Sequence, residues 1–480
     1  MFRSAFFLIS GNASSSLLLL IRNLAIAHLI SVEDYGVAMT LAIAMSVVEM
    51  LSALGMSSQI VQAKHGDDPE FQAALHGFTA LRGLFSCILL FATAGLMADF
   101  LGVPDLAWAY QMMALSPLIR GFEHFDIFRY KRTMRFGPGL IVGFGSVVAA
   151  LAVVWPVYLI FPDYRIMLVS LLVQAAFGTI ISHIVAERPY RIRFDPMTWA
   201  GSTRFGWPLL VNGILLFAVM QGDKLVAGRI LGLEPLGILA MGITLTLTPT
   251  LVLERSLNNL FLPLLSNSQD DDSKFQRLFE ITIEAVLAAT LVYLFLMVAA
   301  GGLLVKVLLD EKFAALSALI GLLAVQQTLR VFKAGGSVVA MARGQTANPM
   351  ISNLVRVASL PIAAWVAHQG GGLVGVIIVA IVGEAIGFLV SLSLIRIRLR
   401  VSLRHLILPI AASIGATGTA TYIAWDVSSE SNFVLAGSTE VAVLLTVVLT
   451  ALATMHQLRG YIIKGKTIRN AADIKRKSRV

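Results

Sequence analysis

The chain is poor in charge and almost lacks cysteine. Charged residues make up 14% of its 480 positions and apolar residues 57%, whereas an ordinary soluble domain is roughly 25% charged. This composition excludes a soluble globular protein. The one cysteine, Cys87, cannot form an intrachain disulfide, and we expect no metal site.

Motifs of chemistry are scarce. The pattern Gly-x-x-x-x-Gly-Lys-Thr occurs once, at residues 460–467, but it lies in the basic tail after an apolar helical run and not between a strand and a helix, so we do not expect ATP to drive this chain directly. No catalytic motif is evident, so the chain is not expected to be an enzyme. The net charge of +9 comes mostly from residues that flank apolar segments. It therefore indicates membrane topology, and no nucleic-acid partner is expected.

Long apolar runs recur from one end of the chain to the other. A window of about 19 residues finds candidate membrane helices throughout, so the sequence predicts an all-α polytopic membrane protein with about 14 transmembrane helices. The spans are expected near residues 6–30, 35–60, 73–101, 107–125, 139–161, 166–186, 205–231, 236–265, 275–309, 314–342, 350–367, 373–395, 405–425 and 433–455.

Basic residues are unevenly distributed between the loops. Alternate loops carry nearly all of them, and the opposite set holds only Arg165 and Lys312. Lys and Arg collect on the cytoplasmic side of bacterial membrane proteins. We therefore expect a multi-pass protein of the inner membrane with both termini in the cytoplasm.

Two weak internal matches predict a duplicated bundle. A shift of 201 residues places Leu24, Glu33 and Gly36 on Leu225, Glu234 and Gly237, and a shift of about 210 aligns residues 118–122 with 328–332. Such repeats are typical of transporters. The predicted parts are two pseudo-symmetric six-helix bundles (1–187 and 205–396), a cytoplasmic interfacial linker (188–204), two appended helices (405–456) and a basic cytoplasmic tail (457–480).

Several local patterns carry a family resemblance when they are taken together. They are LISVEDYG at 29–36, GMSSQIVQ at 55–62, YKRTMRF at 130–136, DKLVAG at 223–228, LGLEPLG at 231–237 and PLLS at 263–266. With them the chain resembles the polysaccharide exporters and lipid-linked oligosaccharide flippases of the MOP superfamily, relatives of the MATE antiporters. One departure is the Leu236-Gly237-Ile238 stretch, where family members usually have aromatic residues beside the glycine.

The resemblance implies a transporter with a MATE-like fold. It would flip undecaprenyl-diphosphate-linked oligosaccharide units from the cytoplasmic to the periplasmic leaflet, for exopolysaccharide, O-antigen or capsule synthesis, by alternating access. A lipid II flippase and a MATE-type cation-coupled antiporter are alternatives within the same class. A membrane-bound polysaccharide polymerase or ligase is the alternative from another class, and the short external loops disfavour it.

Ionisable residues inside the predicted spans are the candidate functional residues. Each costs about 2.5–3.5 kcal/mol on insertion scales and so needs a partner or a water-filled cavity. Basic residues outnumber acidic ones, which suits an anionic diphosphate. The residues predicted to line a cationic substrate cavity are Arg22, Arg82, Lys224, Arg330, Lys333 and Arg356. For each, a structural ion pair or a position at the lipid headgroups is the alternative.

Three acidic residues are candidates for coupling transport to an ion gradient. Glu49, Asp223 and Glu384 lie inside spans, where a carboxylate can bind Na⁺ or carry H⁺. A salt bridge to a neighbouring Arg is the alternative. No cofactor is expected beyond such an ion. The expected partners are the lipid-linked oligosaccharide, membrane lipids and a polysaccharide polymerase with its co-polymerase.

Overall fold

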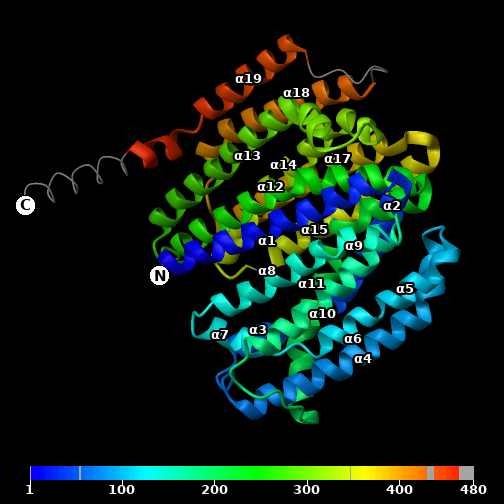
Figure 1. Cartoon of the computed structure of the whole chain (residues 1–480). Helices are drawn as coiled ribbons and strands as arrows, with labels where there is room; N and C mark the ends of the chain where they lie inside the picture. The colour runs from blue at the N-terminus through cyan, green and yellow to red at the C-terminus, as the bar shows by residue number, and fades with distance from the viewer. Residues whose placement is uncertain (1, 53–55, 346, 430–436, 464–480) are drawn as a thin grey trace, which may run out of the picture. The chain divides into compact units, whose positions relative to one another are not determined.

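A computed structural model describes residues 2–52, 56–345, 347–429 and 437–463 (Figure 1). These residues form helices joined by short loops, and no β-strand occurs among them. The predicted all-α fold is confirmed. Some side chains inside the helices are not described, that of Glu49 in α2 among them.

The chain forms two compact units. The first comprises Met1–Thr244 and Ala364–Val376, and the second Leu245–Ala363 and Ile377–Val480. Helices α12 (Leu233–Ser266), α16 (Leu360–Val366) and α17 (Gly372–Leu399) each contribute to both units. The sequence instead predicted two bundles divided by a linker at 188–204. That division differs from the two units and stays a prediction.

In the first unit, α8 packs against α1 and α10, and α4 packs against α5 and α6 (Figure 1). The helices that lie wholly within this unit are α1 (Phe2–Leu29), α2 (Val32–Ser52), α3 (Met56–Gln62), α4 (Pro69–Phe100), α5 (Ala107–Met113), α6 (Leu115–Gly121), α7 (Asp126–Arg132), α8 (Gly137–Ala152), α9 (Val154–Tyr158), α10 (Arg165–Ile184) and α11 (Pro196–Val226), with the short turns η1 (Pro104–Leu106), η2 (Ala227–Leu231) and η4 (Ala367–Gly371).

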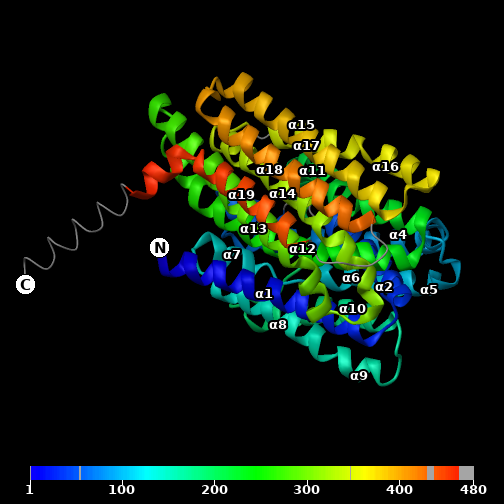
Figure 2. The same ribbon diagram turned by 90° about the horizontal axis from the view of Figure 1, so that it is seen from above.

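In the second unit, α13 and α14 pack together and both contact α18, which also packs against α19 (Figure 2). The helices that lie wholly within this unit are α13 (Asp272–Leu308), α14 (Ala314–Ala342), α15 (Ala347–Ala358), α18 (Ile407–Ser429) and α19 (Ser438–Ala453), with the short turns η3 (Glu311–Phe313) and η5 (Arg404–Leu406).

Every predicted span overlaps one helix or a broken pair of helices. Within the described chain, eight helices are long and apolar enough to cross a membrane, or nine if the bent pair Ser438–Ala453 and His456–Ile463 is one span. The protein therefore spans a membrane several times. The predicted number of 14 spans is not confirmed.

Three helix starts show how the sequence sets the boundaries. Asp68, Asp195 and Asp271 each accept a hydrogen bond from backbone N–H groups in the first turn of α4, α11 and α13. Proline follows the first two of these aspartates, and its missing N–H is no loss at that position. Because Asp195 starts α11 at Pro196, the second part of the predicted linker is helical.

Two glycines allow the starts of α2 and α12 to touch. A Cβ added to Gly36 would overlap the carbonyl oxygen of Leu233, and one added to Gly237 would overlap that of Val32. Both glycines belong to the first unit. The shift of 201 positions that relates Gly36 to Gly237 also relates Val32 to Leu233. The contact is therefore reciprocal between positions that the sequence match pairs.

Candidate functional site

Three of the predicted site residues meet in the interior of the second unit. The Nζ of Lys333 on α14 lies 2.8 Å from Oε2 of Glu384 on α17. The Nε of Arg356 on α15 lies 3.3 Å from Oε1 of the same carboxylate. All three side chains are buried. We call Lys333, Arg356 and Glu384 the buried triad.

Small residues around Glu384 make room for the two cations. A Cβ on Gly387 would lie 3.2 Å from Cδ of Lys333, and one on Gly383 would lie 3.3 Å from Cδ of Arg356. Arg356 also donates to Oγ of Ser359 at 2.7 Å. The one-turn spacing of the two glycines places them on the same face of α17.

The triad contains two cations and one carboxylate, and both carboxylate oxygens face a cation. A buried charge requires a partner, and here Glu384 serves both cations. The structural alternative stated for Glu384, an ion pair with a basic neighbour, matches this geometry. The triad retains one excess positive charge, so an anion that approached it would be attracted.

Arg22 lies in the first unit, on α1, and is buried. Its guanidinium donates to Oε1 of Gln174 on α10 at 2.8 Å and to Oδ1 of Asn23 at 3.2 Å. Lys224 on α11 donates to Oε1 of Gln221 at 3.2 Å. Gln221 in turn donates to Oγ of Ser46 at 3.0 Å.

The remaining predicted residues lie on four different helices. Asp223 is buried on α11, Arg82 is half-buried on α4 with one guanidinium nitrogen 3.8 Å from Sδ of Met56, and Arg330 is half-buried on α14. Glu49 lies on α2 with its side chain outside the described part of the structure. The assignment of the six cations to one cavity and of three acids to ion coupling stays a prediction.

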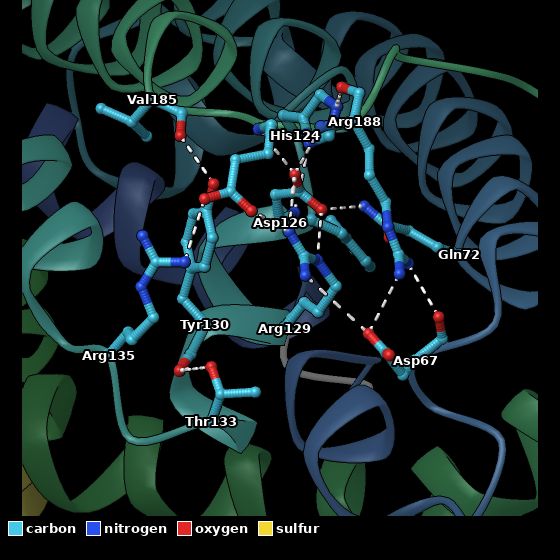
Figure 3. Close-up of polar contacts among 12 residues, drawn as sticks. Asp67, Gln72, His124, Asp126, Arg129, Tyr130, Thr133, Arg135, Val185 and Arg188 are labelled. Carbon is cyan, nitrogen blue, oxygen red and sulfur yellow. Dashed lines mark hydrogen bonds and ion pairs between the residues drawn. The ribbon is translucent and has the colours of Figure 1, made fainter.

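A second polar cluster, around Asp126, was not predicted. Asp126 begins α7 and its side chain is buried (Figure 3). One carboxylate oxygen accepts from Nε of Arg129 and Nε2 of Gln72, both at 2.9 Å. The other accepts from the backbone N–H groups of Glu187 and Arg188, both at 2.9 Å. The cluster thus joins α4 and α7 to the loop before α11.

Charge at this cluster is closely matched. Burial by itself would raise the pKa of Asp126, but its hydrogen bonds, with that from Arg129 the strongest, hold the pKa well below its usual range. Hydrogen bonds from Arg129 and Arg135 likewise lower the pKa of Glu187. Both carboxylates are therefore anionic at neutral pH.

Two histidines bind the same loop in fixed tautomers. His76 accepts the N–H of Phe125 at Nε2, so its Nδ1 carries the hydrogen that is donated to the carbonyl of Arg191 at 3.0 Å. His124 accepts the N–H of Asp126 at Nδ1 and donates from Nε2 to the carbonyl of Arg188 at 3.0 Å. These bonds fix the loop to the first unit. Within the described residues, no group of three or more His, Cys, Asp or Glu could hold a metal ion.

A sequence signal for the Asp126 cluster did exist. Residues 122–126 read FEHFD and place two acids and a histidine directly before the basic run at 129–135. Acidic residues so close to a basic run indicate ion pairs at a helix end. Their partners in residues 67–72 and 187–188 are distant in sequence and could not be inferred.

Comparisons with known proteins agree with this architecture. The solved structure of the lipid II flippase MurJ in an inward closed conformation superposes with a TM-score of 0.70, at 12% identity, over 95% of this chain and 99% of that one. An inward-facing multidrug resistance MATE transporter of the MOP superfamily gives 0.65 at 14% identity, over 80% and 94%. The fold is like that of MurJ and the MATE transporter, as predicted.

Sequence comparison identifies the family. The model of the family described as "Polysaccharide biosynthesis protein" matches residues 25–318, more than half of the chain. The chain belongs to this family. The amylovoran biosynthesis protein AmsL of Erwinia amylovora is 25% identical over 304 residues, which cover 61% of this chain and 76% of that protein. The two superposed structures are named as a flippase and a multidrug resistance transporter.

Proposed function

We propose that this protein flips an undecaprenyl-diphosphate-linked oligosaccharide unit from the cytoplasmic to the periplasmic leaflet of the bacterial inner membrane. The observation that carries the proposal is the family match over residues 25–318. The relative named for amylovoran biosynthesis and the flippase fold support it. The product would enter exopolysaccharide, O-antigen or capsule synthesis.

The buried charges suit an anionic substrate. The triad holds one more cation than anion, and Arg22 donates to the neutral side chains of Gln174 and Asn23. A diphosphate carries the opposite charge and could be bound by guanidinium groups in bidentate fashion. In this proposal, Arg22, Arg82, Lys224, Arg330, Lys333 and Arg356 attract the diphosphate during alternating access.

The proposal includes an energy source, a location and partners. Na⁺ or H⁺ binding at Glu49, Asp223 or Glu384 would couple transport to an ion gradient. Both termini would lie in the cytoplasm, because the basic loops and tail do not cross the membrane readily. A polysaccharide polymerase and its co-polymerase would receive the product at the periplasmic face.

The test is glycan export in a strain that lacks the native gene. Expression of the wild-type chain should restore export. Arg330→Ala should be present at normal abundance but lower export at least tenfold, because charge-assisted contacts are worth about 1.5–3 kcal/mol. Arg330→Lys should retain part of the activity. Normal glycan export by the deletion strain without any copy of the chain would contradict the proposal.

The same strains test the alternative of lipid II transport, which the superposition over 95% of the chain favours. The chain would then support growth when the cell's own lipid II flippase is depleted. We expect no such rescue. Rescue of growth without restoration of glycan export would replace the proposed substrate with lipid II.

A further inference from the structure

The first unit contains a polar pocket that none of the predicted roles uses. Its volume is about 320 Å³, at the lower end of the roughly 300–1,000 Å³ typical of small-molecule sites. Its polar lining comes from α1, α8, α10 and the end of α6. These residues are Ser15, Arg120, Glu123, Ser146, Gln174 and Thr179.

The pocket lies near the end of the first unit that carries the Asp126 cluster. Glu123 is three residues before Asp126, and Thr179 lies five residues before the end of α10. Gln174 connects the pocket to Arg22, since its Oε1 accepts the guanidinium at 2.8 Å. The pocket is therefore adjacent to one of the predicted substrate cations.

Two groups at the pocket have unused hydrogen-bonding capacity. The half-buried carboxylate of Glu123 makes no hydrogen bond or ion pair within the described part of the chain. The amide NH₂ of Gln174 donates to no described residue, because the side-chain bond of Gln174 uses its oxygen. The charges of Arg120 and Lys131 act on the Glu123 carboxylate, but Glu123 still lines the cavity, and an acid that lines a cavity is a sign of a ligand site.

Two hydroxyl groups add acceptors. Oγ of Ser146 donates to the carbonyl of Gly143 at 2.9 Å, and Oγ1 of Thr179 donates to that of Ile119 at 3.1 Å. Each oxygen therefore keeps its lone pairs for a ligand. The pocket offers acceptors at Glu123, Ser146 and Thr179 and a donor at Gln174.

This mixed set discriminates between ligand classes. A metal ion would be opposed by the guanidinium of Arg120 and could not use the NH₂ donor of Gln174. A phosphate would be opposed by the carboxylate of Glu123. Hydroxyl groups both donate and accept, so a compact ligand with several hydroxyls satisfies every group at once.

We propose that this pocket binds one sugar ring of the transported glycan, with hydroxyls donating to Glu123 and accepting from Gln174. This inference rests on the proposed function, since it names a subsite for the oligosaccharide. The volume admits a single ring and not a whole repeat unit. The pocket would hold that ring while the diphosphate engages the buried cations.

The experiment measures monosaccharide binding to the full-length protein in lipid nanodiscs by saturation-transfer NMR. The probes are the methyl glycosides of glucose, galactose and glucuronic acid. At least one should show saturation transfer from the wild type. Glu123→Gln, which removes the charge, and Gln174→Glu, which keeps an oxygen for Arg22 but removes the donor, should each raise its Kd at least tenfold.

Ser146→Ala is a milder third variant that removes one acceptor and should weaken binding severalfold if the first two fail to fold. Glu311→Gln is the matched control, because Glu311 is exposed in η3 and does not line the pocket. It should bind as the wild type does. Equal binding by all pocket variants would overturn the proposal.

Other outcomes would also overturn it. If no glycoside binds the wild type, the pocket is not a sugar site. If Glu123→Gln abolishes the broadening of the ²³Na line and leaves the sugar signals unchanged, the pocket holds a cation. Export in cells separates the two proposals. Export without sugar binding contradicts only the pocket, whereas sugar binding without export contradicts only the flippase function.

Discussion

At the scale of single residues, the buried triad links charge to stability. Glu384→Gln would leave Lys333 and Arg356 buried without a carboxylate, whereas Lys333→Met would leave a neutral pair of Glu384 and Arg356. Removal of one partner from a buried ion pair costs about 3–5 kcal/mol. We expect Glu384→Gln to lower the free energy of unfolding by about that much, and Lys333→Met to lower it by clearly less.

Thermal unfolding of the purified variants in one detergent, followed by intrinsic fluorescence, gives this order directly. The double variant Lys333→Met/Glu384→Gln keeps one buried cation. Its melting temperature should not be lower than that of Glu384→Gln alone. Equal melting temperatures for the two single variants would contradict this order, and melting of both at the wild-type temperature would show that the ion pairs contribute little to stability.

The Asp126 cluster gives a prediction with a defined pH window. The pKa of Asp126 in the folded protein is lowered, so its stabilising effect is fully present above the unfolded value of about 3.9. It is lost as the pH falls below that value toward the folded one. Asp126→Asn should therefore melt below the wild type by a constant amount from pH 8 to 5, and the two should converge below about pH 4.

The matched control for Asp126→Asn is Asp310→Asn, at an exposed carboxylate in the second unit. It should melt close to the wild type throughout. A difference between Asp126→Asn and the wild type that grows as the pH falls from 8 to 5 would contradict the assigned direction of the pKa shift.

The sequence could identify buried charges but not their partners. Depth along an apolar run was enough to single out Lys333, Arg356 and Glu384. Their pairing depends on how α14, α15 and α17 pack, which no local pattern encodes. Glu123 and Asp126 were missed because they lie at the end of an apolar run, beside basic residues that suggested topology alone.

At the scale of secondary-structure elements, two arginines hold helix ends in related ways. The guanidinium of Arg132, at the end of α7, donates to the carbonyls of Ile60, Val61, Ala63 and Lys64 after or within α3. In the second unit, Arg343 follows α14 and donates to the carbonyls of Gln269 and Leu399. The separation of Arg132 and Arg343 along the sequence is close to the second internal shift of about 210 residues.

Loss of this contact should loosen the segment after α3. Arg132→Ala removes a cation from carbonyls at and just beyond the C-terminal end of α3, of which that of Ala63 also accepts the N–H of Gly66 at 3.1 Å, and a cation at that end is favourable. Because hydrogen bonds to charged groups are worth about 1.5–3 kcal/mol, amide hydrogen exchange in residues 61–66 should accelerate at least tenfold. Arg135→Ala, which loses an exposed ion pair with Glu187, is the control and should leave that segment unchanged.

Helices were predictable from hydropathy as elements, and their interruptions were not. Apolar runs locate α4, α10 and α13 within a few residues. The predicted span 107–125 instead forms two seven-residue helices, α5 and α6, and 139–161 breaks between α8 and α9. Apolar composition is continuous across these breaks, so hydropathy misses them. Pro117 and Pro156, each three residues after a break, are the sequence signal that hydropathy leaves out, because a proline removes the bond to the carbonyl four residues earlier.

At the scale of the whole molecule, the alternating basic loops predict which side of the membrane each loop occupies. Reporter fusions after Arg193 should be cytoplasmic and those after Gly232 periplasmic, since Lys and Arg near helix ends retard translocation. Alkaline phosphatase and a fluorescent protein report the two sides in opposite ways. A periplasmic signal after Arg193 would invert the proposed direction of transport.

The fold class could be predicted from the sequence, but the compact units could not. Composition predicted a helical membrane protein and the family resemblance implied a MATE-like fold, and the superpositions agree. The observed units divide inside α12, α16 and α17. A helix that continues through a boundary leaves no polar linker or composition change by which the boundary could be found.

The touching starts of α2 and α12 have a consequence for how this chain can vary. Because Gly36 faces Leu233 while Gly237 faces Val32, the chain makes with itself the isologous contact that a homodimer makes across its two-fold axis. In a homodimer, one gene change alters both sides of such a contact together. Here each side mutates alone, so either glycine can be lost only if the backbone of the opposite helix moves away.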